Sequence, residues 1–199
     1  MSEIADVVSE TIEHPVEGRL NSVIALAVAV TATFTALCNV KDGNVVQAME
    51  QDQAGAVDQW SYYQAKGTKQ NLAEAVLDQM SLERELRPDL PADGRARLDK
   101  KIAEYAASVK KFEEEKLQIK AKAEDLQRDY DRLNVHDDQF DLAEALMSVA
   151  IALFGITALT RKKALLGFAA FLAGVGIFFG LAGFLQWRIH PDFLTRLLS

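Results

Sequence analysis

Apolar residues are gathered into three long stretches of the chain, separated by polar sequence. Residues 20–40 and residues 164–187 contain no charged side chain, and residues 142–160 contain only Glu144. An α-helix needs about 20 residues to cross the hydrocarbon core of a bilayer, because it rises about 1.5 Å per residue. The pattern therefore predicts three transmembrane helices over these ranges.

The polar sequence between the first and second apolar stretches has the period of a coiled coil. Apolar residues recur there at alternating steps of four and three over about six heptads, with one lysine and one aspartate among them. The positions are Leu98, Ile102, Tyr105, Val109, Phe112, Lys116, Ile119, Ala123, Leu126, Tyr130, Leu133, Asp137 and Phe140. This spacing predicts a coiled-coil arm over residues 95–138.

A break in the helical pattern lies before this arm, in the sequence RPDLPADG from Arg87 to Gly94. Two prolines and a glycine stop a helix, so the sequence predicts a turn over residues 88–94. Residues 44–87, on the other side, have a helical pattern of similar length. We therefore expect an all-α membrane protein in which an antiparallel coiled-coil hairpin is inserted between the first and second transmembrane helices.

The most unusual stretch of the first arm is DQWSYYQAK, residues 58–66. Trp60 and Tyr63 follow the heptad rhythm, and a turn centred near residue 91 would place them opposite Ile119 and Ala123. We expect these four residues to pack inside the hairpin, with Tyr62 exposed. A surface for a ligand or protein partner is the alternative for the same aromatic residues.

The charge of the chain narrows the range of partners. The net charge is −7, and residues 1–19 form a mostly acidic N-terminal segment. Nucleic-acid binding requires an excess of Lys and Arg, so we expect none. A signal peptide begins with positive residues, so the first apolar stretch is interpreted as an anchor. The single thiol, Cys38, excludes an intramolecular disulfide.

Small residues recur in two of the predicted transmembrane helices. Gly174, Gly176, Gly180 and Gly183 lie in the third, and Ala25 and Ala29 lie in the first. Small side chains let helix backbones approach closely in lipid. We therefore expect these residues to make helix contacts, some of them between subunits of a homo-oligomer.

The short connection between the second and third apolar stretches is wholly basic. It consists of Arg161, Lys162 and Lys163. Basic residues in short loops favour the cytoplasmic side of a membrane. The expected topology has a cytoplasmic N-terminus, an extracytoplasmic hairpin and an extracytoplasmic C-terminal tail over residues 188–199. We expect a multi-pass protein of the bacterial inner membrane, in contact with its lipids.

Candidate chemistry is sparse along the chain. Asp137, Asp141 and Glu144 would share one helix face, but this spacing is not specific to a cation, and acidic residues also favour a helix start. The sequence contains no phosphate-binding loop, dinucleotide fingerprint, zinc-protease motif, nucleophile elbow or CxxC pair. We expect no catalytic residues, no cofactor and no metal, and we do not expect an enzyme.

The order of these features resembles a known family. An acidic N-terminus, one span, the stretch DQWSYYQAKGTKQNL, a charged helical hairpin and a closing pair of spans are similar to the bacterial family called domain of unknown function 4337. The resemblance implies a bacterial membrane protein. It implies no activity, cofactor or catalytic residue.

Two functions are compatible with this organisation. The first is a non-enzymatic, oligomeric membrane scaffold or adaptor that presents the hairpin to a protein partner. The second is a small oligomeric channel whose pore is lined by the first transmembrane helix, through Thr31 and Thr35. A conductance that changes when these threonines are substituted would favour the channel.

Overall fold

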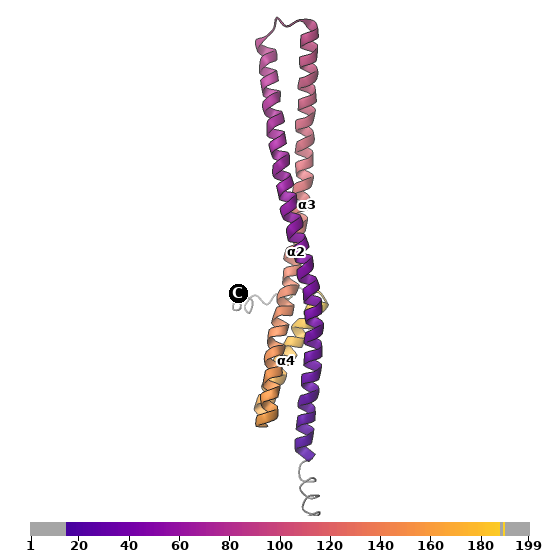
Figure 1. Cartoon of the computed structure of the whole chain (residues 1–199), viewed down its shortest axis with the longest axis vertical. Helices are drawn as coiled ribbons and strands as arrows, with labels where there is room; N and C mark the ends of the chain where they lie inside the picture. Colours follow the sequence, from indigo (N-terminus) through magenta and orange to yellow (C-terminus); the bar gives the residue numbers. More distant parts are fainter. Residues whose placement is uncertain (1–14, 188, 190–199) are drawn as a thin grey trace, which may run out of the picture. The chain divides into compact units, whose positions relative to one another are not determined.

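The computed structural model describes residues 15–187 and residue 189, and these residues form helices without strands (Figure 1). The helices are α2 (Pro15–Leu86), α3 (Ala92–Thr160) and α4 (Lys163–Phe184). Each contains a segment long and apolar enough to cross a membrane. The all-α prediction is confirmed for this part of the chain. Residues 1–14, 188 and 190–199, which include most of both predicted terminal segments, lie outside it.

The two long helices each join a predicted span to a predicted arm. Helix α2 continues from residues 20–40 into residues 44–87, and α3 continues from residues 95–138 into residues 142–160. The junction in α2, Lys-Asp-Gly-Asn at residues 41–44, changes the hydropathy but contains no proline. A change of polarity alone does not end a helix, because the backbone hydrogen bonds continue through it.

The connection between α2 and α3 is set by its prolines. Pro88 follows the end of α2 and Pro91 precedes Ala92, the first residue of α3. Proline lacks an N–H, so it suits the first turn of a helix better than the interior. Helix α3 therefore begins inside the turn predicted over residues 88–94. The guanidinium of Arg95 also donates a hydrogen bond of 3.2 Å to the Pro88 carbonyl.

The connection between α3 and α4 is shorter still, since only Arg161 and Lys162 separate the helices. Arg161 has a φ of 56°, in the left-handed region, and its N–H donates to the Thr157 carbonyl at 2.8 Å. The Lys162 carbonyl then accepts from the N–H groups of Leu165 and Leu166 in the first turn of α4. This reversal closes the end of one apolar helix and begins the next.

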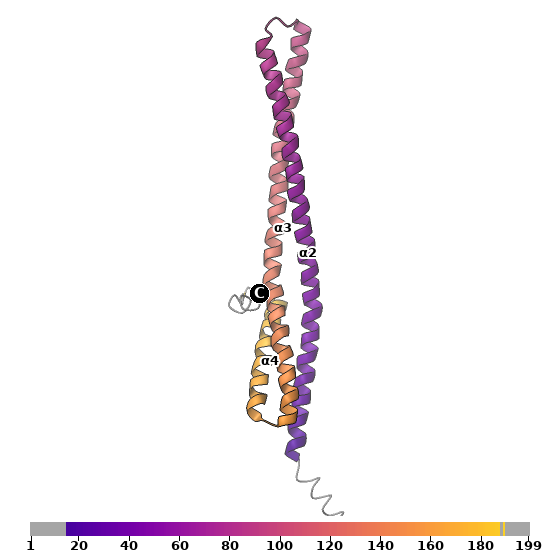
Figure 2. The ribbon, with the colours of Figure 1, turned by 60° about the vertical axis from the view of Figure 1, so that its left-hand side comes forward.

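The chain divides into two compact units, which are described separately. The apolar unit comprises residues 1–48 and 132–199, and the charged unit comprises residues 49–131. In the apolar unit, α4 lies beside α3 (Figure 2). The core cluster consists of Ile24, Ala150, Phe154, Ala169 and Ala173.

In the charged unit, the second part of α2 lies beside the first part of α3 (Figures 1 and 2). Ile119 and Ala123 of α3 are buried, as are Met49, Ala56 and Ala73 of α2. Met49 and Ala56 are seven residues apart, so they lie on the same face of α2.

Candidate functional site

Three glycines of α4 provide close helix contacts within the chain. A Cβ at Gly176 would lie 2.7 Å from Met147 Cγ and 3.1 Å from the carbonyl oxygen of Ala143. A Cβ at Gly180 would meet Phe34 and Cys38 of α2, and one at Gly183 would meet the Phe140 ring. These positions require the absence of a side chain because a helix or an aromatic ring occupies the space.

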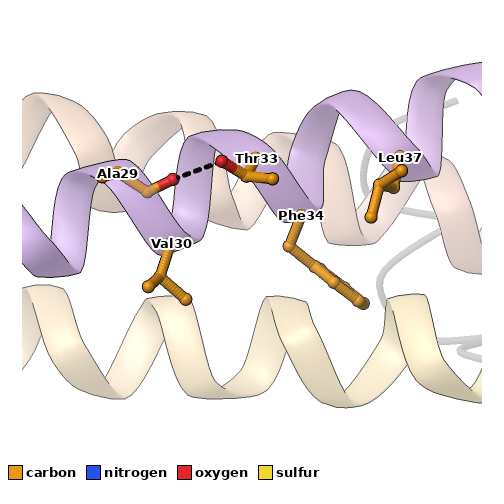
Figure 3. A pocket seen from close by; sticks show the side chains of 5 residues that line it. All are labelled: Ala29, Val30, Thr33, Phe34 and Leu37. Atoms are coloured by element: carbon orange, nitrogen blue, oxygen red, sulfur yellow. Dashed lines mark hydrogen bonds between the residues drawn. The ribbon is translucent and has the colours of Figure 1, made fainter.

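The other small residues singled out in the sequence do not make such contacts within the chain. A Cβ at Gly174 would meet no atom within 4 Å. Ala25 and Ala29 of α2 are exposed. Ala29 lines one side of an open apolar hollow of about 380 Å³, and Val30 and Phe34 point from there toward α4 (Figure 3). Figure 3 also shows the hydrogen bond of 2.8 Å from Thr33 Oγ1 to the Ala29 carbonyl.

The hydroxyl groups of Thr33 and Thr35 donate to backbone carbonyls of α2 itself. Thr35 Oγ1 donates to the Thr31 carbonyl at 2.9 Å and lies 3.5 Å from Met147 Sδ. Thr31 is only 3% exposed within a single chain. Hydroxyl groups bonded in this way are already satisfied, so they do not require a pore.

The basic connection predicted to set the topology is fully at the surface. Arg161, Lys162 and Lys163 are all exposed at the junction of α3 and α4. Exposed basic side chains in a short connection can contact water and lipid headgroups.

The aromatic stretch of the charged unit surrounds a lysine. Lys66 forms an ion pair with Glu115 of α3, and its ammonium lies 5.4 Å from the Tyr62 ring centre and 5.3 Å from that of Phe112. A cation over an aromatic face is attracted by the ring's negative face. The hydrogen bond that Lys66 donates to Glu115 lowers the pKa of Glu115 and raises the pKa of Lys66.

A second lysine makes the reverse contact from α3 to α2. The ammonium of Lys116 lies 5.0 Å from the Tyr63 ring centre. Gly67 leaves space beside it, because a Cβ there would lie 3.7 Å from the same ammonium. Lys66 of α2 thus contacts the Phe112 ring of α3, and Lys116 of α3 contacts the Tyr63 ring of α2.

The four residues predicted to pack inside the hairpin are not all buried. Tyr63 is half-buried, and Ile119 and Ala123 are buried in α3. Trp60 is 36% exposed and packs edge to face on Tyr63 of its own helix, with ring centres 5.6 Å apart. The seam of α2 passes one position earlier, at Gln59, so Trp60 lies at its edge. Tyr62 is 49% exposed.

Acidic side chains of α2 and α3 meet just outside the apolar stretches. Asp42 of α2 lies near the carboxyl groups of Asp137 and Asp141 of α3, and its Oδ1 is buried without a hydrogen-bond partner among the described residues. Burial raises the pKa of Asp42 to about 6, and the charges of Asp137 and Asp141 add to this effect. Burial and the charge of Asp141 also raise the pKa of Asp137. Two adjacent carboxyl groups resist ionising together.

Other polar contacts lie beside Asp42 and Asp137. Asn39 Nδ2 donates to Glu144 Oε1 at 3.3 Å, which links α2 to α3 a second time. Gln139 is fully buried, and its amide donates to the carbonyls of Trp187 at 2.8 Å and Ile189 at 2.6 Å. Its oxygen lies 3.2 Å from His136 Nδ1. Gln139 therefore fastens the chain that follows α4 onto α3.

Sequence reasoning did not single out Asp42, Gln139 or the Lys66–Glu115 pair. Gln139 has the clearest signal in retrospect, because it is a polar residue beside Phe140 on a largely apolar face. Lys66 carried no such signal, because the heptad rhythm that contains Trp60 and Tyr63 continues at Gly67. In the described ranges, no group of three His, Cys, Asp or Glu side chains is arranged to hold a metal ion.

These features define a class of protein before they define a function. The described chain is all-helical, with three helices apolar enough to span a membrane. The chain belongs to the family described as Domain of unknown function (DUF4337), whose model matches residues 20–186. No curated protein and no solved structure shows significant similarity to the chain.

Proposed function

We propose that the protein is a non-enzymatic membrane scaffold or adaptor that self-associates and presents an antiparallel helical hairpin to a protein partner. The observation that carries this proposal is the reciprocal pairing of Lys66 with Glu115 and of Lys116 with Tyr63. Such contacts fix the register of two helices, which is the requirement for a stiff hairpin. In these contacts the charged and aromatic side chains bind each other and do not surround a substrate.

The order of the contacting pairs supports the antiparallel arrangement. Gly55 faces Leu126, Lys66 pairs with Glu115 and Arg84 pairs with Asp99. As the residue number rises in α2, it falls in α3. A coiled coil formed within one chain would have this order, with residues 44–87 and 95–138 as its arms.

A partner surface on the hairpin is supported by exposed apolar side chains in a polar segment. Val57 is 60% exposed and lies one turn from Trp60. Aromatic residues are enriched where proteins contact each other, because they bury a large area with few rotatable bonds. We assign the partner contact to this flank of α2, next to the ion-paired lysine.

Self-association is assigned to α2 and not to the packed glycines of α4. Gly176, Gly180 and Gly183 already contact helices of the same chain. Ala25 and Ala29 are exposed and would let a second α2 approach closely. We place the protein in the bacterial inner membrane, with the basic connection at residues 161–163 and the N-terminus in the cytoplasm and the hairpin outside it.

Native mass spectrometry in lipid nanodiscs tests the assembly. Ala25→Leu/Ala29→Leu should dissociate the oligomer, while Gly167→Leu/Gly174→Leu, at open positions of α4, should leave it intact. A wild-type monomer would contradict self-association. Loss of the oligomer in both variants would contradict the assignment to α2.

Two further measurements separate the scaffold from the alternatives. A cysteine at position 89 in a Cys38→Ser background should react with a membrane-impermeant maleimide in intact spheroplasts if the hairpin is extracytoplasmic. Reconstituted protein should show no conductance; a conductance altered by Thr33→Val, the exposed threonine of the three, would favour the channel instead.

A further inference from the structure

We propose that a cleft between α2 and α3 in the charged unit binds a small amphipathic carboxylate, a molecule with one anionic group and an apolar body. The cleft has a volume of about 350 Å³, and its lining residues lie within residues 69–76 of α2 and 105–112 of α3. Volumes of about 300–1,000 Å³ are typical of small-molecule sites. The inference goes beyond the proposed scaffold and does not depend on self-association or on membrane topology.

Two small side chains leave the middle of the cleft open. Ala73 of α2 is buried, and Ser108 of α3 is half-buried, and both line the cleft. Phe112 lies one turn after Ser108, and Tyr105 lies one turn before it. Space remains between the larger side chains because neither alanine nor serine is long enough to fill it.

The two lining ranges are positively charged, although the chain is acidic overall. They contain Lys69, Lys110 and Lys111 and one acidic residue, Glu74, whereas the whole chain has a net charge of −7. The Glu74 carboxylate accepts a hydrogen bond of 2.8 Å from Gln70 of its own helix. The local field therefore favours an anionic ligand over a cationic one.

Lys69 is the lining residue that would bind the anionic group. Its side chain is exposed, and among the residues that the structure describes it forms no ion pair. Its neighbour Lys66 is paired with Glu115, and the other oxygen of that carboxylate lies 4.0 Å from Lys111. Because Glu115 already contacts two other lysines, the Lys69 ammonium keeps its hydrogen-bond donors for a ligand.

The rest of the cleft offers apolar surface to the body of the ligand. Leu72 is 67% exposed, and Val76 and Phe112 are half-buried, so each has apolar surface that a ligand can cover. Removal of such surface from water favours binding. Lys69 and Val76 lie about 10 Å apart along the helix axis, which matches an extended chain of about eight carbon atoms.

Isothermal titration calorimetry with octanoate and the full chain in lipid nanodiscs tests the site. After subtraction of the heat with empty nanodiscs, the wild type should show saturable binding. Lys69→Gln should raise the Kd about tenfold or more, the loss expected for one charge-assisted hydrogen bond. Lys122→Gln removes the same charge at an exposed position of α3 outside the cleft and should keep the wild-type Kd. No saturable binding to the wild type, or an equal loss in both variants, would overturn the proposal.

A photoreactive analogue shows where the ligand binds. Octanoate that carries a diazirine should label residues within 69–76 or 105–112, and unlabelled octanoate should compete. Ser108→Leu, which fills the middle of the cleft, should lose this labelling; if it does not fold, Lys69→Gln, at an exposed position, should show reduced labelling instead. Labelling confined to residues 20–40, 142–160 or 164–187 would indicate partition into lipid and would contradict the site, as would unchanged labelling of a folded variant.

Discussion

Replacing Gly176 by alanine tests whether α4 packs on α3 as closely as the structure shows. The new methyl group would lie 2.7 Å from Met147 Cγ, 3.1 Å from the Ala143 carbonyl oxygen and 3.3 Å from the Met147 nitrogen. The Met147 side chain can turn away, but the two backbone atoms belong to α3 and cannot. Relief therefore requires the two helices to separate by a few tenths of an ångström.

The cost follows from the response of tightly packed sites to added atoms. Overpacking by one methyl group costs about 1–3 kcal/mol, and we expect about 2 kcal/mol for Gly176→Ala because backbone atoms are involved. Gly174→Ala is the matched control, since it lies in the same helix and its methyl group would meet no atom within 4 Å. At that position alanine should be neutral or gain up to about 1 kcal/mol from its higher helix propensity.

The assay is reversible unfolding in mixed micelles with increasing sodium dodecyl sulfate, followed by circular dichroism. The unfolding midpoint of Gly176→Ala should be lower than that of the wild type, and that of Gly174→Ala should not. Both variants should keep the mass of the wild-type particle, because the contact lies within one chain. Equal stability of the two variants would refute the packing argument.

Three other changes have defined outcomes. Lys66→Glu should lower the Tm by placing two carboxylates together, and Lys66→Glu/Glu115→Lys should recover part of the loss; absence of recovery would mean that the pair does not set the register. Gln139→Leu leaves the Trp187 and Ile189 carbonyls without their donor and should cost about 2 kcal/mol or more, with altered Trp187 fluorescence in a Trp60→Phe background; an unchanged spectrum would contradict the fastening role. Trp60→Ala should change the Tm less than Tyr63→Ala, because Trp60 lies at the edge of the seam; the reverse order in thermal unfolding would place Trp60 inside it.

The heptad spacing of apolar residues predicted which positions of a helix face inward where that spacing was regular. The seam of α3 follows the predicted positions, with Ile119 and Ala123 buried among them. The seam of α2 was harder to place, because polar residues occupy much of it, including Gln59 and Lys66. With few apolar positions to fix the phase, a shift of one residue moves Trp60 from the centre of the interface to its edge.

The polar contacts were less predictable than the helices. Asp42 and Asp137 lie 95 residues apart, and their meeting depends on how α2 and α3 pair in space. Likewise, nothing in the local sequence of Gln139 indicates that its partners are carbonyl groups after α4. Gly176, Gly180 and Gly183 lie in close helix contacts and Gly174 does not, and sequence alone does not distinguish a neighbour in the same chain from one in another.

The reversal at Arg161 and Lys162 has a consequence for how the protein is made. Two residues form the whole connection, so the end of α3 and the start of α4 stay within about 11 Å of each other, three Cα–Cα steps. The two apolar helices should leave the insertion machinery together, as a preformed pair. The translated chain would then acquire its first membrane anchor from α2 and complete its insertion in one later event.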